Sequence, residues 1–169
     1  GNITIGNNVK IRANSTIIDS VIGSEIEIKH YSLVKKSIIS DNSVIGPYAR
    51  LRSGTEIGDG SQIGSFVEIK NSIIGKSCKI NHMAFIGDAD IEDNVIIGAG
   101  TITCNHDGND AQKTVICSGA YIGSNVNLIA PLTIGRNAFI GAGSTITEDA
   151  PDDKLTLSRI RQVSVQRKK

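Results

Sequence analysis

Aromatic residues and a strong net charge are both scarce in this sequence. Its 169 residues include no tryptophan, three phenylalanines and three tyrosines, and 18 basic residues stand against 17 acidic ones, for a net charge of +1. Nucleic-acid-binding proteins usually carry a basic surface and often stack bases on aromatic rings. We therefore expect no nucleic-acid partner.

Cysteines are few, and long hydrophobic runs are missing. Cys78, Cys104 and Cys117 are odd in number and lack CxxC spacing, which argues against a disulfide scaffold or zinc site and favours the reducing cytoplasm. No apolar stretch approaches the roughly 18 residues of a membrane span. The first residues also lack the charged and hydrophobic regions of a signal peptide. We therefore expect a cytoplasmic protein without a membrane partner.

A repeat of six residues is the dominant feature of the sequence. Aliphatic residues return at this interval with small deviations, and asparagine or glycine often follows three residues later. Both reach positive φ at low cost, so each hexad indicates a short strand closed by a tight corner. The aliphatic positions are Ile5, Ile11, Ile28, Val34, Ile45, Leu51, Ile57, Ile63, Ile69, Ile80, Ile86, Ile97, Ile122, Leu128, Ile134, Ile140 and Ile146.

This period is typical of a parallel β-helix, in which three hexads form one coil. Residues about 18 apart then stack at about 4.8 Å, and each coil buries its aliphatic side chains only against neighbouring coils. Five-residue steps, such as the one from Ile69 to Ile74, shorten some coils. A β-sandwich is the alternative, but its strands have no reason to keep a six-residue interval. We predict an all-β hexapeptide-repeat β-helix.

The predicted domain organisation is a β-helix over residues 1–148 and a basic C-terminal tail over 149–169. One polar loop, residues 104–115, interrupts the repeat, and a loop of that length on a regular scaffold is more often functional than decorative. The tail contains Arg159, Arg161, Arg167, Lys168 and Lys169. It is either a solvated segment or an arm that meets an anionic ligand.

Two basic residues fall at one predicted corner. Arg52 and Lys70 each follow a core aliphatic residue on adjacent coils, so their side chains would lie about 5 Å apart. Two cations at that separation repel unless an anion lies between them, which suggests a phosphate clamp. The alternative is a salt bridge to a nearby acid, or two solvated side chains.

The register also gathers candidate catalytic groups. His82 and Ala99 are predicted side by side at the next corner, and the face between the two corners presents Arg50, Glu68, Phe85 and Ile102. Glu68 would lie within reach of His82, where a carboxylate fixes the imidazole tautomer and raises its basicity. The other histidines, His30 and His106, cannot share one ion with His82 in a protomer, so we expect no metal.

Several motifs together carry a family resemblance. The segments IGPYARLRSG at 45–54, FVEIK at 66–70, NH at 81–82, GDA at 87–89 and NVIIGAGTITCNHDG at 94–108 resemble the acetyltransferase domain of the bacterial bifunctional N-acetylglucosamine-1-phosphate uridyltransferase/glucosamine-1-phosphate acetyltransferase. The resemblance implies a left-handed β-helix and a homotrimer. It also implies acetyl transfer from acetyl-CoA to the amine of glucosamine 1-phosphate, on the route to UDP-N-acetylglucosamine.

The same resemblance implies roles for individual residues. His82 is the expected general base with Glu68 as its partner, Arg52 and Lys70 are the expected ligands of the sugar phosphate, and Phe85 and Ile96 match acceptor-binding positions. The positions that match acetyl-CoA contacts are Ala99, Asn105, His106, Ser124, Ala142 and Arg159.

Four residues depart from the family pattern. Phe85 replaces a tyrosine, Ile96 an asparagine, Ala111 a lysine, and His106 a tyrosine beside the CoA. Each lost hydrogen bond to the acceptor costs about 0.5–1.5 kcal/mol, or more where a charge is involved. Two alternatives stay open: a hexapeptide acyltransferase with another amino-sugar acceptor, or a weakly active or non-catalytic trimeric platform. The sequence also lacks the glycine-rich start of a uridyltransferase, so the chain is either part of a longer protein or naturally short.

Overall fold

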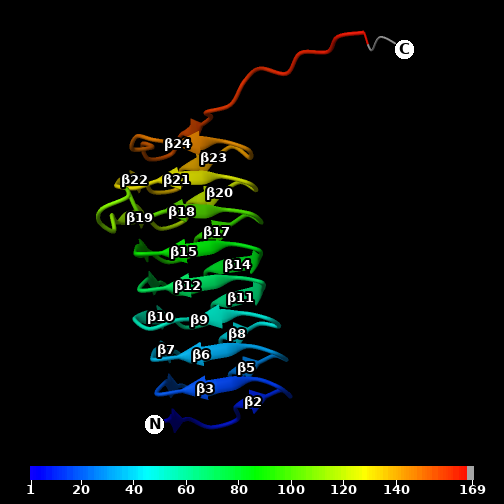
Figure 1. Ribbon diagram of the computed structural model, residues 1–169, viewed down its shortest axis with the longest axis vertical. Helices are drawn as coiled ribbons and strands as arrows, with labels where there is room; N and C mark the ends of the chain where they lie inside the picture. Colours follow the sequence, from blue (N-terminus) through cyan, green and yellow to red (C-terminus); the bar gives the residue numbers. More distant parts are fainter. Residues whose placement is uncertain (167–169) are drawn as a thin grey trace.

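A computed structural model describes residues 1–166, and these residues form one long column of stacked coils (Figure 1). Every complete coil contributes one short strand to each of three parallel sheets. This is the parallel β-helix that the six-residue repeat predicts, and it fits the left-handed form that the resemblance implies. Arg167, Lys168 and Lys169 of the expected tail lie outside the described residues.

The three sheets run along the axis of the column. Sheet A contains β1 (Thr4–Ile5), β4 (Val21–Ile22), β7 (Ser37–Ile39), β10 (Thr55–Ile57), β13 (Ile73–Ile74), β16 (Ala89–Ile91), β19 (Thr114–Ile116) and β22 (Leu132–Ile134). Sheet B contains β2 (Lys10–Ile11), β5 (Glu27–Ile28), β8 (Val44–Ile45), β11 (Gln62–Ser65), β14 (Lys79–His82), β17 (Ile96–Ile97), β20 (Tyr121–Ile122), β23 (Phe139–Ile140) and β25 (Leu155–Thr156). Sheet C contains β3 (Thr16–Ile18), β6 (Leu33–Lys35), β9 (Arg50–Leu51), β12 (Glu68–Lys70), β15 (Phe85–Gly87), β18 (Ile102–Cys104), β21 (Asn127–Ile129) and β24 (Thr145–Ile146).

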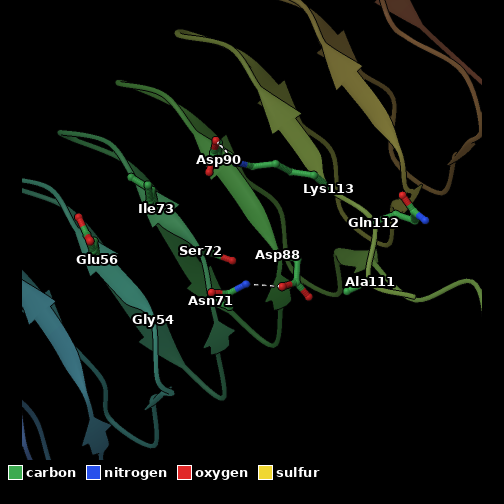
Figure 2. A pocket seen from close by; sticks show the side chains of 10 residues that line it. All are labelled: Gly54, Glu56, Asn71, Ser72, Ile73, Asp88, Asp90, Ala111, Gln112 and Lys113. Atoms are coloured by element: carbon green, nitrogen blue, oxygen red, sulfur yellow. Dashed lines mark hydrogen bonds and ion pairs between the residues drawn. The ribbon is translucent and has the colours of Figure 1, made fainter. Parts of the chain in front are cut away.

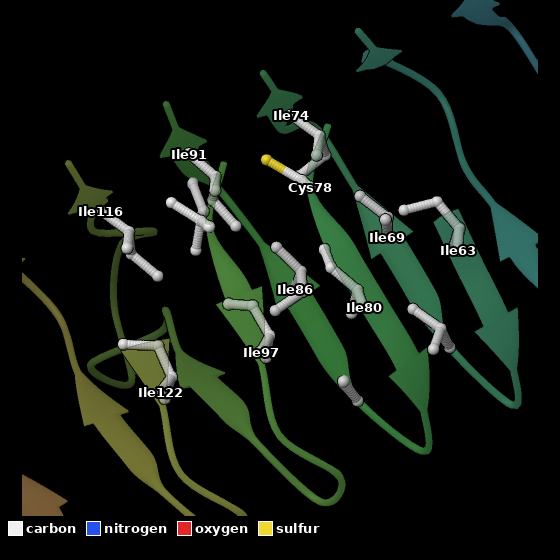
Figure 3. Close-up of a cluster of buried hydrophobic side chains, with 14 of the residues drawn as sticks. Ile63, Ile69, Ile74, Cys78, Ile80, Ile86, Ile91, Ile97, Ile116 and Ile122 are labelled. Carbon is white, nitrogen blue, oxygen red and sulfur yellow. The ribbon is translucent and has the colours of Figure 1, made fainter. Parts of the chain in front are cut away.

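Stacked isoleucines form the core. Ile63 pairs with Ile80, and Ile80 with Ile97, so one aliphatic position recurs in register from coil to coil. Their side chains point inward and meet those of the other two sheets (Figure 3). Because a strand alternates between faces, the residue before each core isoleucine points outward and remains free to carry function.

Neighbouring residues of β13 allow the contribution of this core to be measured. Ile74 is 1% exposed, whereas Ile73 is 51% exposed on the outer face of sheet A. We expect Ile74→Ala to lower the free energy of unfolding by about 2–5 kcal/mol, because it leaves a cavity between coils. Ile73→Ala should change it by less than about 0.5 kcal/mol. Urea denaturation of both variants measures the difference, and equal effects would contradict the assigned orientation of the strand.

The corners contain residues that the repeat alone does not predict. Asn94 and Asn125 take positive φ, as expected, but Tyr31, Tyr48 and Phe66 also do so, with φ of 58°, 57° and 57°. Positive φ is uncommon for bulky side chains. These three rings stack on successive coils with centroids 5.1 Å apart, which offsets part of the backbone strain. The ladder runs along the corner that joins sheets B and C.

The column continues one partial coil beyond the expected boundary at residue 148. The strand β25 pairs with β23, and Ala150, which is buried, bridges to Ile134. The sequence pattern misses this coil because Ala150 and Thr156 occupy positions that hold isoleucine in the coil below. The chain leaves the column after Ser158, whose N–H still donates to Ser144 Oγ at 3.1 Å, and the segment that follows extends away from the coils (Figure 1).

Candidate functional site

His82 ends β14 at the corner between sheets B and C, where it is exposed. The backbone N–H of Gly100 donates to the carbonyl oxygen of Met83 at 3.0 Å. That hydrogen bond, together with the pairing of Ile80 with Ile97, places Ala99 beside His82 on the next coil. The predicted proximity of His82 and Ala99 is therefore confirmed.

The same corner column continues upward past Ala99. Asn125 N–H donates to the carbonyl oxygen of Ala99, and Gly143 N–H donates to that of Ser124, both at 2.8 Å. Arg159 Nη1 then donates to the carbonyl oxygen of Ala142, also at 2.8 Å. Four of the six residues expected at acetyl-CoA thus lie in or against one row above His82, namely Ala99, Ser124, Ala142 and Arg159.

The outward face of sheet C holds the predicted row of side chains. Glu68 pairs with Arg50 on one side and with Phe85 on the other, and Phe85 pairs with Ile102. The expected contact between Glu68 and His82 is not formed: among the described residues, no hydrogen bond or ion pair joins them. Both oxygens of Glu68 are instead taken by arginines, because Arg52 Nη1 lies at 2.9 Å and Arg50 Nη1 at 3.3 Å.

Arg52 and Lys70 lie side by side at the other end of this face, as predicted. The N–H of Arg52 donates to the carbonyl oxygen of Ile69 at 2.8 Å. Each cation has a carboxylate nearby, since Arg52 contacts Glu68 and Lys70 Nζ lies 3.9 Å from Asp88. The salt-bridge alternative therefore holds, and a phosphate would compete with these carboxylates for the same cations.

A pocket of about 230 Å³ opens beside this pair. Its charged lining is entirely basic, which makes it suited to an anion. The lining residues are Leu33, Lys35, Arg50, Leu51, Arg52, Ser53 and Lys70. We call this space the anion pocket. Neither Lys35 nor Arg50 is among the site residues that the sequence predicts, although Arg50 falls on the predicted face and Lys35 falls in the column of Arg52 and Lys70.

The inserted loop leaves the column at the end of β18 and returns at β19. Its turn is ordered by Asp107, whose carboxylate accepts hydrogen bonds from the backbone N–H groups of Asp110 and Asn109, each at 2.8 Å. These bonds and one from Gln112 lower the pKa of Asp107 to about 2. His106, one of the expected acetyl-CoA residues, bridges to Ala111 and accepts a hydrogen bond at Nδ1 from the backbone of Gly108.

A larger pocket of about 490 Å³ lies beneath the loop, against sheet A (Figure 2). Ala111, Gln112 and Lys113 line its loop side, and Lys113 forms an ion pair with Asp90. Asp88 lines the opposite side together with Asn71. Ala111, which stands where the family has lysine, therefore faces a polar space rather than the core.

The three residues that depart from the resemblance at expected acceptor positions do not meet within one chain. Phe85 faces outward from sheet C, Ile96 faces outward from sheet B, and Ala111 lies in the loop between sheets C and A. A single protomer therefore presents them on three different surfaces.

The three cysteine thiols are poorly suited to act as nucleophiles. Burial raises the pKa of Cys78, Cys104 and Cys117, so these thiols stay protonated at neutral pH.

Within residues 1–166 no group of three or more histidine, cysteine or acidic side chains is arranged to hold a metal ion. The same residues include no helix long and apolar enough to cross a membrane.

Two family models match parts of the chain. The model of the GMPPB C-terminal domain matches residues 1–60, and that of the bacterial transferase hexapeptide (six repeats) matches residues 113–148. LpxA from Acinetobacter baumannii has a similar solved structure, with a TM-score of 0.63 at 17% identity, over 90% of this chain and 68% of that one. At that identity the likeness shows the fold alone.

Curated relatives match almost the whole chain. The bifunctional protein GlmU of Carboxydothermus hydrogenoformans is 51% identical over 164 residues, which are 97% of this chain and 36% of the relative. The same protein of Azoarcus sp. (strain BH72) is 47% identical over 165 residues, which are 98% of this chain and again 36% of the relative. The chain thus spans about a third of the length of these relatives. Over nearly its whole length, this chain is therefore similar to one part of the bifunctional protein GlmU.

Proposed function

We propose that this chain transfers the acetyl group of acetyl-CoA to the amine of glucosamine 1-phosphate, a step toward UDP-N-acetylglucosamine. One observation carries the proposal: the row from His82 through Ala99, Ser124 and Ala142 runs along one corner of a face that ends in the anion pocket. An extended thioester can lie along the row while a phosphate occupies the pocket. The identity to GlmU proteins supports the same reading.

The chemistry follows from the groups at the lower end of the row. An amine attacks a thioester only as the free base, so His82 takes the proton as the amine attacks. The N–H of Ala99 is the proposed donor to the negative charge that develops on the carbonyl oxygen. The carbon–sulfur bond then breaks, and the departing thiolate receives the proton. Arg159, at the upper end, is positioned for the phosphates of CoA.

In the proposed reaction, Glu68 changes its hydrogen-bond partner when the acceptor binds. Without an anion, it neutralises Arg50 and Arg52. A phosphate bound to Arg52 competes with Glu68 for the same guanidinium, so acceptor binding frees one oxygen of the carboxylate. We propose that Glu68 then turns toward His82 and supports it as a base.

We further propose a homotrimer in the cytoplasm. Phe85, Ile96 and Ala111 match positions of one acceptor site but lie on three surfaces, and adjacent protomers would bring such surfaces together. The three free cysteines suit a reducing compartment. No metal takes part in the proposed reaction.

A turnover assay on a panel of acceptors tests the proposal. Thiol release from acetyl-CoA should be fastest with glucosamine 1-phosphate and should scale with enzyme concentration. Faster release with another amino-sugar phosphate would favour the second candidate, an acyltransferase with a different acceptor. The apolar side chains of Phe85 and Ile96 are the observation behind that candidate.

Loss of the clamp should weaken binding of the phosphate selectively. We expect Arg52→Ala and Lys70→Ala each to raise the KM for glucosamine 1-phosphate about tenfold or more, since a charged hydrogen bond contributes about 1.5–3 kcal/mol. The kcat should change less, because the phosphate is remote from the reacting amine. Initial-rate kinetics measure both constants. Lys76→Ala, whose side chain pairs with Asp59 outside the site, is the control; equal loss with unphosphorylated glucosamine would contradict the clamp.

A further inference from the structure

Asp88 is the least exposed acid among the ion pairs that residues 1–166 form. Its side chain is only 12% exposed, compared with 40% for Asp90, which lies on the strand that follows. A carboxylate that is mostly removed from water is costly unless hydrogen bonds and a cation compensate for its charge. The surroundings of Asp88 supply both.

Three side chains converge on this carboxylate. Asn71 Nδ2 donates to Oδ1 at 2.5 Å, and Asn105 Nδ2 donates to Oδ2. Lys70 Nζ lies 3.9 Å from Oδ2. The contact with Asn71 is visible in Figure 2, at the edge of the pocket beneath the loop. One carboxylate thus joins the Lys70 end of the anion pocket to Asn105, the first residue after β18.

The backbone of Asp88 makes the same connection. Its N–H donates to the carbonyl oxygen of Lys70 at 3.1 Å, and its carbonyl oxygen accepts from the N–H of Thr114 at 3.2 Å. Asn105 and Thr114 bound the inserted loop, so both of its ends contact Asp88. The residue holds φ at 49°, a left-handed conformation that aspartate and asparagine tolerate better than other side chains.

Asp90 provides the contrast. It lies two residues further along the chain, and its carboxylate pairs with Lys113 on the outer face of sheet A. Neither Lys70 nor Asn105 is among the hydrogen-bond or ion-pair partners of Asp90 in the described part of the chain. Removing its charge therefore tests for a general effect of a lost carboxylate beside the loop.

We propose that Asp88 is a positioning residue that holds the Lys70 ammonium in the anion pocket and fixes Asn105 and the loop relative to it. The inference rests on the proposed function for the identity of the two substrates, because Lys70 belongs to the proposed phosphate site and Asn105 to the proposed acetyl-CoA site. Asp88 thereby couples the two sites without touching either substrate. In the sequence, Asp88 stands 17 residues after Asn71, the length of a shortened coil, and this spacing is the signal that could have predicted their contact.

The test compares Asp88→Asn with Asp90→Asn in the full chain. In Asp88→Asn, the KM values for glucosamine 1-phosphate and for acetyl-CoA should both rise about tenfold, the scale of one lost charge-assisted hydrogen bond, with kcat within about twofold. Backbone hydrogen exchange in residues 105–114 should become faster. Asp90→Asn should leave both KM values at the wild-type level, and any faster exchange in it should be confined to Lys113 and its neighbours, because Lys113 loses its partner.

A double-mutant cycle separates positioning from general destabilisation. If Asp88 acts on the acceptor through Lys70, then Asp88→Asn should add no further rise in the acceptor KM once Lys70→Gln is present. Additive effects would overturn the proposal, and so would unchanged exchange in residues 105–114. Should Asp88→Asn fail to fold, Asp88→Glu keeps the charge and should show a smaller rise in both KM values; wild-type kinetics in that variant would equally overturn it.

The exchange measurement does not depend on catalysis. If the wild-type chain transfers acetyl to no acceptor, the proposed function fails, whereas faster exchange at the Asn105 end of the loop in Asp88→Asn, but not in Asp90→Asn, still supports the anchoring role. If turnover is present and exchange is the same in all variants, the proposed function stands and the role of Asp88 is refuted.

Discussion

Replacing His82 with alanine is expected to lower the rate of acetyl transfer by about 10²–10⁴-fold, the usual contribution of a general base. The fold should persist, because His82 is exposed at the end of β14 and lies outside the buried core. Thiol release from acetyl-CoA measures the rate, and calorimetric titration should give the same acetyl-CoA affinity for both proteins.

His30→Ala is the matched control for this experiment. His30 lies in the same corner column as His82, three coils nearer the N-terminus, and is not part of the proposed row. Its replacement should leave the rate unchanged. Undiminished turnover in His82→Ala, or an equal loss in His30→Ala, would contradict the assignment of His82 as the general base.

Restoring the family residues at the acceptor positions is expected to raise kcat/KM for glucosamine 1-phosphate by about 10²-fold. The triple variant Phe85→Tyr, Ile96→Asn and Ala111→Lys adds a hydroxyl, an amide and an ammonium, each able to recover about 1 kcal/mol. None of the three positions is in the buried core, so the changes should not disturb the stacking of the coils. Steady-state kinetics of the wild type and the variant measure the gain.

The opposite result would identify a reshaped site. If the natural acceptor is another amino sugar, the same triple variant should lose activity on it, because polar groups without a partner are penalised when a ligand covers them. Ile129→Asn, an exposed change elsewhere on sheet C, should have no effect on either acceptor. Bound acetyl-CoA without turnover, before and after restoration, would favour the non-catalytic platform.

Much of the site could be predicted because the repeat determines the register. A core position repeated every coil is enough to place Ala99 beside His82 and to align Arg50, Glu68 and Phe85 on one face. Arg52 and Lys70 follow from the same register. These statements concern backbone neighbours, which the hydrophobic period specifies directly.

The repeat does not specify which of several neighbouring groups a polar side chain contacts. Glu68 had both a histidine and two arginines nearby, and the stronger attraction of two guanidinium groups decided its contacts. The convergence on Asp88 likewise depends on side chains from three coils, of which only the column positions are visible in the sequence. The last partial coil was missed because alanine and threonine there replace the isoleucine that marks a strand.

The inserted loop has a consequence for how such a protein can change. Ile91 pairs with Ile116 across the insertion just as Ile74 pairs with Ile91 one coil earlier. The extra residues of the loop therefore leave the strand pairing of sheet A unchanged. Closing a longer loop costs little additional entropy, about 0.6 kcal/mol per doubling of its length. Substitutions, insertions or exchanges between Asn105 and Lys113 can therefore accumulate almost independently of stability. If the chain acts as proposed, its choice of acceptor can therefore change through this loop at little cost to folding.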